Sequence, residues 1–295
     1  MVTLCEMKRQ IIFIVGLQKS GTTLMLRILK QSDLVEIPFK AEGNDFWGNM
    51  PPFDPCEFPA GVIYQRSGGE MGHEIDGDDA TQEIHKTLHD RLAGIVTACP
   101  IVANKNPYNT VRLPWIRKLF PDSMIIAMVR RPIPNVFSLL KKHVPHEGGG
   151  LSPKEGWWGV KPKGWRRVVN ENKVIQCATQ WKMVNEKLWH DKAHIDMIVT
   201  YHHLCASPTE VLNKILATAL DRAFKADVTL PRIQCFDSEY KHGARLLSKN
   251  KYYRASGSLV TGETEPVEIG PLKEEDIACI EKICGETQSM IEGLQ

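Results

Sequence analysis

A lysine between two glycines has the clearest chemical potential in this sequence. Residues 16–23 read Gly-Leu-Gln-Lys-Ser-Gly-Thr-Thr. The glycines permit tight turns, so successive backbone N–H groups can face one anion, and Lys19 adds a full positive charge. We therefore predict that this segment holds a phosphate group. The alternative is a glycine-bounded turn that carries a solvated lysine.

The order of these residues differs from that of a Walker loop, G-x-x-x-x-G-K-[ST], in which the lysine directly follows the second glycine. Here Lys19 stands two places before Gly21, and Thr22 occupies the place expected for the lysine. The sequence thus predicts a related phosphate loop in which the cation approaches from a different position.

The residues around this loop predict the elements that would position it. Residues 11–15 are Ile-Ile-Phe-Ile-Val, a short continuous apolar run typical of a central parallel strand buried on both faces. From Ser20 to Lys30 the composition becomes helical, with apolar residues near one face. The first unit is therefore predicted to be strand, loop and helix, with the helix N-terminus facing the anion.

Strands and helices alternate along the rest of the chain. Further strands are expected at residues 34–37, 101–104, 124–130 and 195–200. The alternation predicts a single α/β domain over residues 1–295, with three layers and a central parallel sheet of about five strands flanked by helices, in the manner of nucleotide kinases.

Helices are predicted from apolar stripes and from capping residues. Ile84, Leu88, Leu92 and Ile95 form one stripe on a helix that starts near Asp79. Ser207 as a cap, followed by Pro208 at the first helical position, predicts a helix through about Leu220, and residues 277–294 predict a long final helix.

Two regions, residues 43–78 and 144–165, interrupt this alternation. The first is rich in proline and glycine, and the second carries three consecutive glycines followed by Trp157, Trp158 and Trp165. Long insertions in a compact domain are commonly lids or binding loops. Because tryptophan is costly to expose, we predict that the second region folds as a lid over an apolar pocket.

The overall charge argues against two classes of partner. The chain has 37 basic and 35 acidic residues, a formal net charge of +2. Proteins that bind nucleic acid or anionic membranes usually show a strong positive field. We therefore expect neither partner, and any anion site must be local.

The cysteines and the N-terminus favour a cytoplasmic protein. The eight cysteines are dispersed without a C-x-x-C pair, so they are expected to be reduced and mostly buried. Lys8 and Arg9 precede the apolar run 11–17, as at the start of a signal peptide, but the run is too short to span a bilayer and no small-residue cleavage site follows.

The order Lys19-Ser20-Gly21-Thr22-Thr23 after a strand resembles the 5′-phosphosulfate loop of the sulfotransferase family. The resemblance implies an enzyme that uses 3′-phosphoadenosine-5′-phosphosulfate (PAPS) and releases adenosine 3′,5′-bisphosphate (PAP), without a metal. It implies that Gln18 and residues 19–23 bind this donor, and that Lys19 stabilises charge on the departing nucleotide.

A second segment resembles the family's site for the 3′-phosphate. Arg130-Arg131-Pro132 follows the strand at residues 124–129, and Ser138 lies eight residues after Arg130. A guanidinium offers several donors to phosphate oxygens, and a hydroxyl adds one more. Strand ends of a parallel sheet meet at one edge, so both phosphate sites can lie together there.

Other stretches are similar to family segments with less specificity. Residues 104–108 resemble a K-T-P segment, with Asn106 in place of threonine, while residues 156–162, Trp181 and residues 201–204 resemble bacterial-type members. For the family's C-terminal glycine-rich loop, which also reaches the 3′-phosphate, the candidates are as follows: Arg254, Ser256 and Gly257, with Lys249 and Lys251 as alternatives.

The sequence offers more than one candidate for the group that accepts the acceptor's proton. Cytosolic members use a histidine two places after a lysine, where this chain has Pro107. Glycan-modifying members use a glutamate about two dozen residues after the loop lysine, which implies Glu42 as general base, with Lys105 as its charge partner. Asp45 and a histidine remain alternatives.

The acceptor is expected to be a small, partly apolar molecule, although the Glu42 region also permits a sugar. The proposed acceptor contacts are Asp45, Phe46, Trp47, Trp157, Trp158 and Trp165. The sequence leaves open whether oxygen or nitrogen is sulfonated, and the oligomeric state.

Three other interpretations deserve a test. A nucleotide kinase would need magnesium and an acidic strand end, whereas residues 124–129 run into Arg130. An inactive nucleotide-binding module would keep the loop without the chemistry. His190 and His194 could suggest a metal site with His202 and His203, but a strand is expected close to His194, which breaks the helical spacing.

Overall fold

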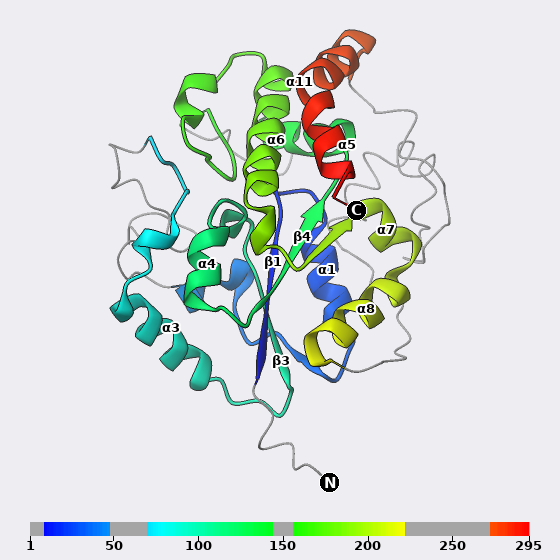
Figure 1. Ribbon diagram of the computed structural model, residues 1–295. Coiled ribbons are helices and arrows are strands. Elements are labelled where there is room, and N and C mark those ends of the chain that lie inside the picture. Colours follow the sequence, from blue (N-terminus) through cyan, green and yellow to red (C-terminus); the bar gives the residue numbers. More distant parts are fainter. Residues whose placement is uncertain (1–8, 48–69, 144–155, 222–271, 295) are drawn as a thin grey trace.

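The computed structural model describes residues 9–47, 70–143, 156–221 and 272–294. Its centre is a parallel sheet in the order β2-β3-β1-β4-β5 (Figure 1). The strands are β1 (Gln10–Val15), β2 (Val35–Glu36), β3 (Ile101–Lys105), β4 (Met124–Val129) and β5 (Met197–Thr200). The five strands predicted from the sequence are confirmed, and β2 and β5 are shorter than expected.

Strand β1 lies between β3 and β4, and its side chains are divided between two cores. Ile12 and Ile14 face one side of the sheet, and Phe13 and Val15 face the other. All four are fully buried. This explains why the strand is a continuous apolar run, because a central parallel strand has no face in water.

Helices α1 (Thr22–Leu29), α7 (Tyr201–Ala206) and α8 (Pro208–Leu220) cover the first face. Leu24, Met25 and Ile28 of α1 pack onto Ile12 and Ile14. Apolar residues at helical spacing therefore bury one stripe of α1 against the sheet. The residues of this core hold the start of α1, and with it the loop before it, against β1.

An aromatic cluster fills the second face, where Phe13 of β1 contacts Trp47 at a ring-centroid distance of 5.6 Å and Phe120 at 5.3 Å. The helices that bear on this face are α2 (Asn44–Trp47), α3 (Gln82–Ala93), α4 (Leu113–Leu119), α6 (Lys173–His190) and α11 (Glu274–Glu292). Leu188 of α6 and Ile291 of α11 join the cluster.

A third apolar cluster lies beyond the carboxyl ends of the strands. It joins α5 (Pro132–Leu140), α6 and α11 to Leu17 of the loop after β1 and to Val160. In Figure 1, α5 and α11 lie at the end of the molecule toward which the arrow of β4 points. Short 3-10 turns complete the described elements: η1 (Ala41–Gly43), η3 (Gly77–Asp79), η4 (Pro107–Val111), η5 (Trp165–Val168) and η6 (Lys192–His194).

The predicted helices are present, with corrections at their starts. The helix expected near Asp79 begins at Gln82, because Thr81 caps it by accepting a hydrogen bond from the Ile84 backbone at 3.2 Å, and Ile95 lies beyond its end. Ser207 precedes α8 as expected, but its side chain makes no capping hydrogen bond.

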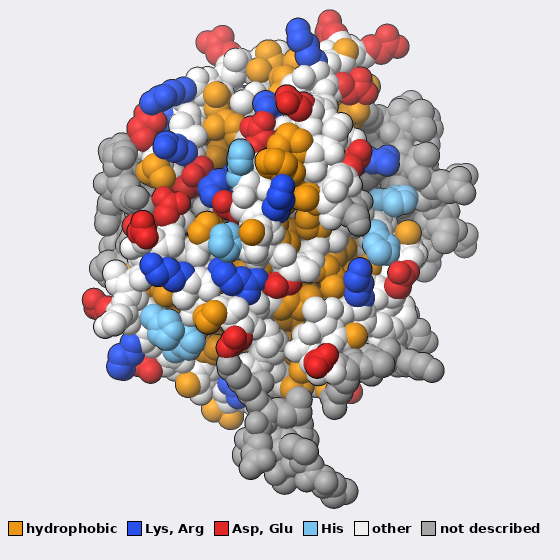
Figure 2. All heavy atoms as spheres, viewed as in Figure 1, with side chains coloured by type: hydrophobic (Ala, Val, Ile, Leu, Met, Phe, Trp, Pro, Cys, Tyr) orange, Lys and Arg blue, Asp and Glu red, His pale blue; other side chains and the backbone are white. Residues whose placement is uncertain are grey.

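Charges and cysteines in the described residues are unremarkable for a folded α/β chain. Figure 2 shows acidic and basic side chains interspersed over the visible face. The five cysteines in this part are free thiols, of which Cys177, Cys205 and Cys284 are buried. Burial raises the pKa of Cys177 and of Cys284 to about 12. None of the helices described is both long and apolar enough to cross a membrane.

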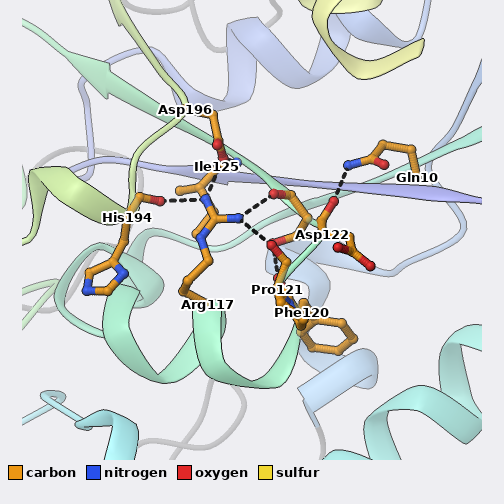
Figure 3. Close-up of polar contacts among 9 residues, drawn as sticks. Gln10, Arg117, Phe120, Pro121, Asp122, Ile125, His194 and Asp196 are labelled. Atoms are coloured by element: carbon orange, nitrogen blue, oxygen red, sulfur yellow. Dashed lines mark hydrogen bonds and ion pairs between the residues drawn. The ribbon is translucent and has the colours of Figure 1, made fainter. Parts of the chain in front are cut away.

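Arg117 of α4 ties together the amino ends of β4 and β5 (Figure 3). Its guanidinium donates to the carbonyl oxygens of Ser123 at 2.7 Å and His194 at 2.7 Å, and to the Asp196 carboxylate at 2.6 Å. The same carboxylate oxygen accepts from the Ile125 backbone at 2.7 Å. A planar guanidinium with several N–H groups can donate to all of these acceptors at once.

Replacing the Arg117 guanidinium should destabilise this edge of the sheet. Arg117→Leu is expected to lower the free energy of unfolding by about 2–4 kcal/mol, because several charge-assisted hydrogen bonds are lost. Lys118→Leu, which changes the neighbouring exposed cation, should change it by less than about 0.5 kcal/mol. Urea denaturation measures both, and equal effects would contradict this role for Arg117.

Candidate active site

The predicted phosphate loop connects β1 to α1, and close contacts constrain both of its glycines. The Gly16 N–H donates to the Thr110 hydroxyl at 2.7 Å. A Cβ at Gly16 would lie 2.4 Å from the Met128 carbonyl oxygen, and one at Gly21 would lie 2.7 Å from the Tyr201 ring. Gly16 and Gly21 also have φ values of 141° and 104°. Neither position has room for a side chain, which explains the glycines.

Lys19 adopts a left-handed backbone conformation, with φ of 70°. Such a conformation is uncommon for a residue with a side chain and costs about 1 kcal/mol or more. The neighbouring Ser20 hydroxyl is buried and has no hydrogen-bond partner in the described part of the chain. Gly21 precedes α1 without a side-chain cap, so the first-turn N–H groups are left for another acceptor.

Arg130 and Ser138 lie beside this loop. One Arg130 nitrogen, Nη1, is 3.3 Å from the Ser138 hydroxyl and 3.3 Å from the Lys19 carbonyl oxygen. The guanidinium carbon lies 4.3 Å from the centroid of the Tyr201 ring, and the Trp181 indole donates to the Arg130 carbonyl at 3.0 Å. The two segments that the sequence marked for phosphate binding are thus in contact.

A cavity of about 360 Å³ adjoins Arg130 at the carboxyl ends of β4 and β5. Its volume is that of a small-ligand pocket. Its lining combines aromatic, basic and acidic side chains from both strand ends and from α6 and α11, and includes Arg131, Trp181, Tyr201, His202, Gln288 and Glu292.

Glu42 and Lys105 form an ion pair on the other side of β1. Lys105 ends β3 and its side chain is 5% exposed, whereas Glu42 is 35% exposed. The second carboxylate oxygen of Glu42 is buried without a hydrogen-bond partner among the described residues. Glu42 also has a left-handed backbone, with φ of 60°. The charge pairing expected from the sequence is therefore present.

The three residues proposed as acceptor contacts after Glu42 have other roles here. Asp45 accepts a hydrogen bond from the Lys40 backbone at 3.0 Å. Phe46 and Trp47 are buried in the aromatic cluster on Phe13, and the Trp47 indole donates to Asn104 at 3.3 Å. This is a correction, because apolar packing explains both aromatic residues without an acceptor.

The three tryptophans of the second inserted region differ in their burial. Trp157 and Trp165 are each 2% exposed and pack on one another at 5.7 Å between ring centroids. Trp158 is only partly buried, and its ring centroid lies 5.8 Å from the Lys19 ammonium. Of the predicted lid tryptophans, Trp158 is therefore the one placed beside the phosphate loop.

His73 joins the described ends of the two inserted regions. The ring Nδ1 of His73 accepts from the Lys161 backbone N–H at 2.9 Å, and the His73 backbone N–H donates to the Lys161 carbonyl at 2.7 Å. Its ring meets Tyr108 edge-on at 4.4 Å. Burial, with smaller effects of the Arg112 and Lys161 charges, holds the pKa of His73 well below its usual value.

Three residues of this region were not predicted from the sequence: Thr110, Asn135 and His73. Thr110 and Asn135 each bond a backbone atom of the phosphate loop, Asn135 by donating to the Gln18 carbonyl at 3.0 Å. No local pattern marks such residues, because they lie far from the loop in sequence. Candidate residues outside the described ranges are Arg254, Ser256, Gly257, Lys249 and Lys251.

The histidines raised as metal candidates are separated by secondary structure. His190 ends α6, and His194 ends η6. Across the described ranges, no group of three or more His, Cys, Asp or Glu side chains is arranged to hold a metal ion.

Comparison with known proteins finds similar sequences and structures. The sequence pattern of the "Sulfotransferase family" matches residues 11–222. A Caenorhabditis briggsae protein, provisionally named protein-tyrosine sulfotransferase, is 27% identical over 176 residues, which are 57% of this chain. The chain spans about half of that relative, since the match covers 54% of it.

Solved structures of two bacterial sulfotransferases are also similar to this chain. The enzyme from Alicyclobacillus acidocaldarius shares 18% identity with a TM-score of 0.43, covering 94% of this chain and 96% of that one. The enzyme from Mycobacterium avium shares 13% identity with a TM-score of 0.47, covering 96% and 76% respectively. On the family match, which spans residues 11–222 and so most of its length, this chain belongs to the sulfotransferase family.

Proposed function

We propose that this protein transfers a sulfonyl group from PAPS to a hydroxyl or amine of its acceptor. The observation that carries the proposal is the position of Arg130, whose Nη1 lies 3.3 Å from both the Lys19 carbonyl and the Ser138 hydroxyl. A donor with phosphate groups at two positions needs two anion sites at one edge of the sheet.

The two anion sites would bind different phosphate groups of the donor. Residues 19–23 and the start of α1 would hold the 5′-phosphosulfate, and Arg130 with Ser138 would hold the 3′-phosphate. The buried Ser20 hydroxyl and Arg130 Nε have no hydrogen-bond partner within the described ranges. Buried polar atoms of this kind are usually satisfied, so both fit a site that receives a polar ligand.

The reaction is an in-line displacement at sulfur. The acceptor oxygen or nitrogen bonds to the sulfur, and the bond from sulfur to the bridging phosphate oxygen breaks, so that PAP leaves. Lys19 stabilises the charge that develops on the leaving phosphate. The acceptor's proton passes to Glu42, whose Oε2 is unengaged while Lys105 holds Oε1. No metal is assigned a role.

The acceptor belongs to one of two classes. The partly buried Trp158 beside Lys19 supports a small molecule with an apolar ring. The name of the Caenorhabditis relative supports a second candidate, a tyrosine of a protein. Either acceptor would present its nucleophilic group to the same base. We also propose a cytoplasmic location, which rests on the dispersed cysteines.

A nucleotide kinase remains the nearest rival. It would need an acidic strand end to hold magnesium, and β4 runs into Arg130. Tight PAP binding without magnesium supports our proposal, whereas magnesium-dependent ATP turnover would support a kinase.

Arg130→Lys should weaken recognition of the 3′-phosphate. A point charge replaces a fork that serves several acceptors, so PAP affinity is expected to fall by about 10- to 100-fold. Affinity for AMP, which lacks the 3′-phosphate, should change less than about threefold. Calorimetric titration measures both ligands, and a parallel loss for AMP and PAP would rule out this assignment.

Glu42→Gln should remove the base while keeping the shape of the side chain. We expect kcat to fall by about 10²- to 10⁴-fold. Asp45→Asn is the matched control, since Asp45 is exposed and bonded to the Lys40 backbone; its kcat should stay within about threefold. If the Asp45 variant were the inactive one, Asp45 would be the base.

Labelled donor should identify the acceptor class. The protein is incubated with ³⁵S-PAPS and either a panel of phenols, amines and sugars or tyrosine-containing peptides, and labelled products are separated. Transfer to one panel and not the other decides between the two candidates.

Lys19→Met should reduce sulfonyl transfer from the labelled donor by about 10²- to 10³-fold while the protein still binds PAP. If it transfers normally, Lys19 has no role in the chemistry.

A further inference from the structure

Gln18 lies in the phosphate loop, yet its side chain bonds a segment far away in sequence. The Val160 N–H donates to Gln18 Oε1 at 3.0 Å. A carboxamide oxygen can only accept hydrogen bonds, and so can the oxygens of an ionised phosphate. Gln18 Oε1 therefore cannot hydrogen-bond a phosphate, whereas it does accept one from the protein's own N–H group. The side-chain oxygen is therefore committed to the segment 156–160.

Close packing accompanies this bond. Gly159 has φ of 89°, and a Cβ at Gly159 would lie 2.7 Å from Gln18 Oε1. The backbone of the segment thus approaches the loop more closely than any residue with a side chain would allow.

Both partners of the bond are held in place by other helices. Asn135 of α5 donates to the Gln18 carbonyl at 3.0 Å, which fixes the loop. Gln180 of α6 donates to the Trp158 carbonyl at 2.8 Å and to the Val160 carbonyl at 3.0 Å, which fixes the segment. The Gln18 side chain is a polar bridge between these two held units, in addition to the apolar cluster that contains Leu17 and Val160.

Trp158 lies two residues before Val160 in the sequence, and two lysines lie near its ring. Its ring centroid is 5.8 Å from the Lys19 ammonium and 5.6 Å from the Lys142 ammonium. The tryptophan therefore stands next to the group that would contact the transferring sulfonyl.

We propose that Gln18 is a positioning residue that fixes Trp158 beside Lys19, so that the wall of the acceptor site is attached to the donor loop. The proposal rests on the proposed function and changes one expectation from the sequence, which gave Gln18 to the donor alone. Its consequence is that Gln18 governs the acceptor side with little effect on donor affinity.

Two variants of Gln18 separate these possibilities. Gln18→Met keeps the length of the side chain and removes the acceptor oxygen, whereas Gln18→Glu keeps an acceptor oxygen. Gln18→Met should speed hydrogen exchange of the Val160 amide by about tenfold, as loss of one hydrogen bond implies, and should make Trp158 more accessible to acrylamide quenching. The Trp158→Phe protein supplies the background fluorescence. Gln18→Glu should retain slow exchange.

A second pair of variants approaches the bridge from the other side. Gly159→Ala adds a methyl that collides with Gln18 Oε1, whereas Gly164→Ala adds one at φ of 75° with no atom within 4 Å. Both variants carry backbone strain, so a difference between them reports the collision with Gln18. Only Gly159→Ala should show the faster Val160 exchange and the greater Trp158 quenching expected for Gln18→Met. This comparison decides the matter even where Gln18→Met fails to fold.

Calorimetry with PAP completes the test. PAP affinity of Gln18→Met should stay within about threefold of the original protein. Unchanged exchange at Val160, or a large loss of PAP affinity with Trp158 still protected, would overturn the proposal. If the original protein does not bind PAP, the proposed function fails, while the exchange comparison still reports on Gln18.

Discussion

Parallel pairing of β1 with both β3 and β4 is the constraint on which the site depends. The register places Ile14 beside Lys105 and Val15 beside Ala127, so the three strands end at one edge. The phosphate loop leaves β1 there, with Lys105 on one side and Arg130 on the other. Strand pairing thereby places a cation-bearing loop between an ion pair and an arginine.

Local strain at this edge is offset by the packing beneath it. Lys19 and Glu42 hold left-handed backbones, at a cost of about 1–3 kcal/mol each. Such conformations persist where the surroundings leave no alternative, and here buried cores lie on both faces of β1. The residues assigned to the chemistry are thus among the few strained ones described, which strengthens their assignment without relying on sequence resemblance.

The sequence predicted the parts of the site that depend on local patterns. The apolar run at 11–15, the glycines of the loop and the arginine after β4 each carry their signal within a few residues. Burial of Phe46, Trp47, Trp157 and Trp165 was not predicted, because an aromatic residue near a motif has the same pattern whether it meets a ligand or the core. Thr110 and Asn135 were missed because only the fold brings them to the loop.

A histidine was one of the bases left open by the sequence. In the pattern considered there it would stand two places after Lys105, where this chain has Pro107. His73 is the imidazole that comes next to this segment, through its edge-on contact with Tyr108. Its Nδ1 already accepts from Lys161, and burial holds its pKa well below the usual value, so it stays neutral as a structural acceptor. An engaged, buried nitrogen cannot take the acceptor's proton, whereas Glu42 keeps one oxygen unengaged beside Lys105. Between these two groups, the geometry favours the carboxylate.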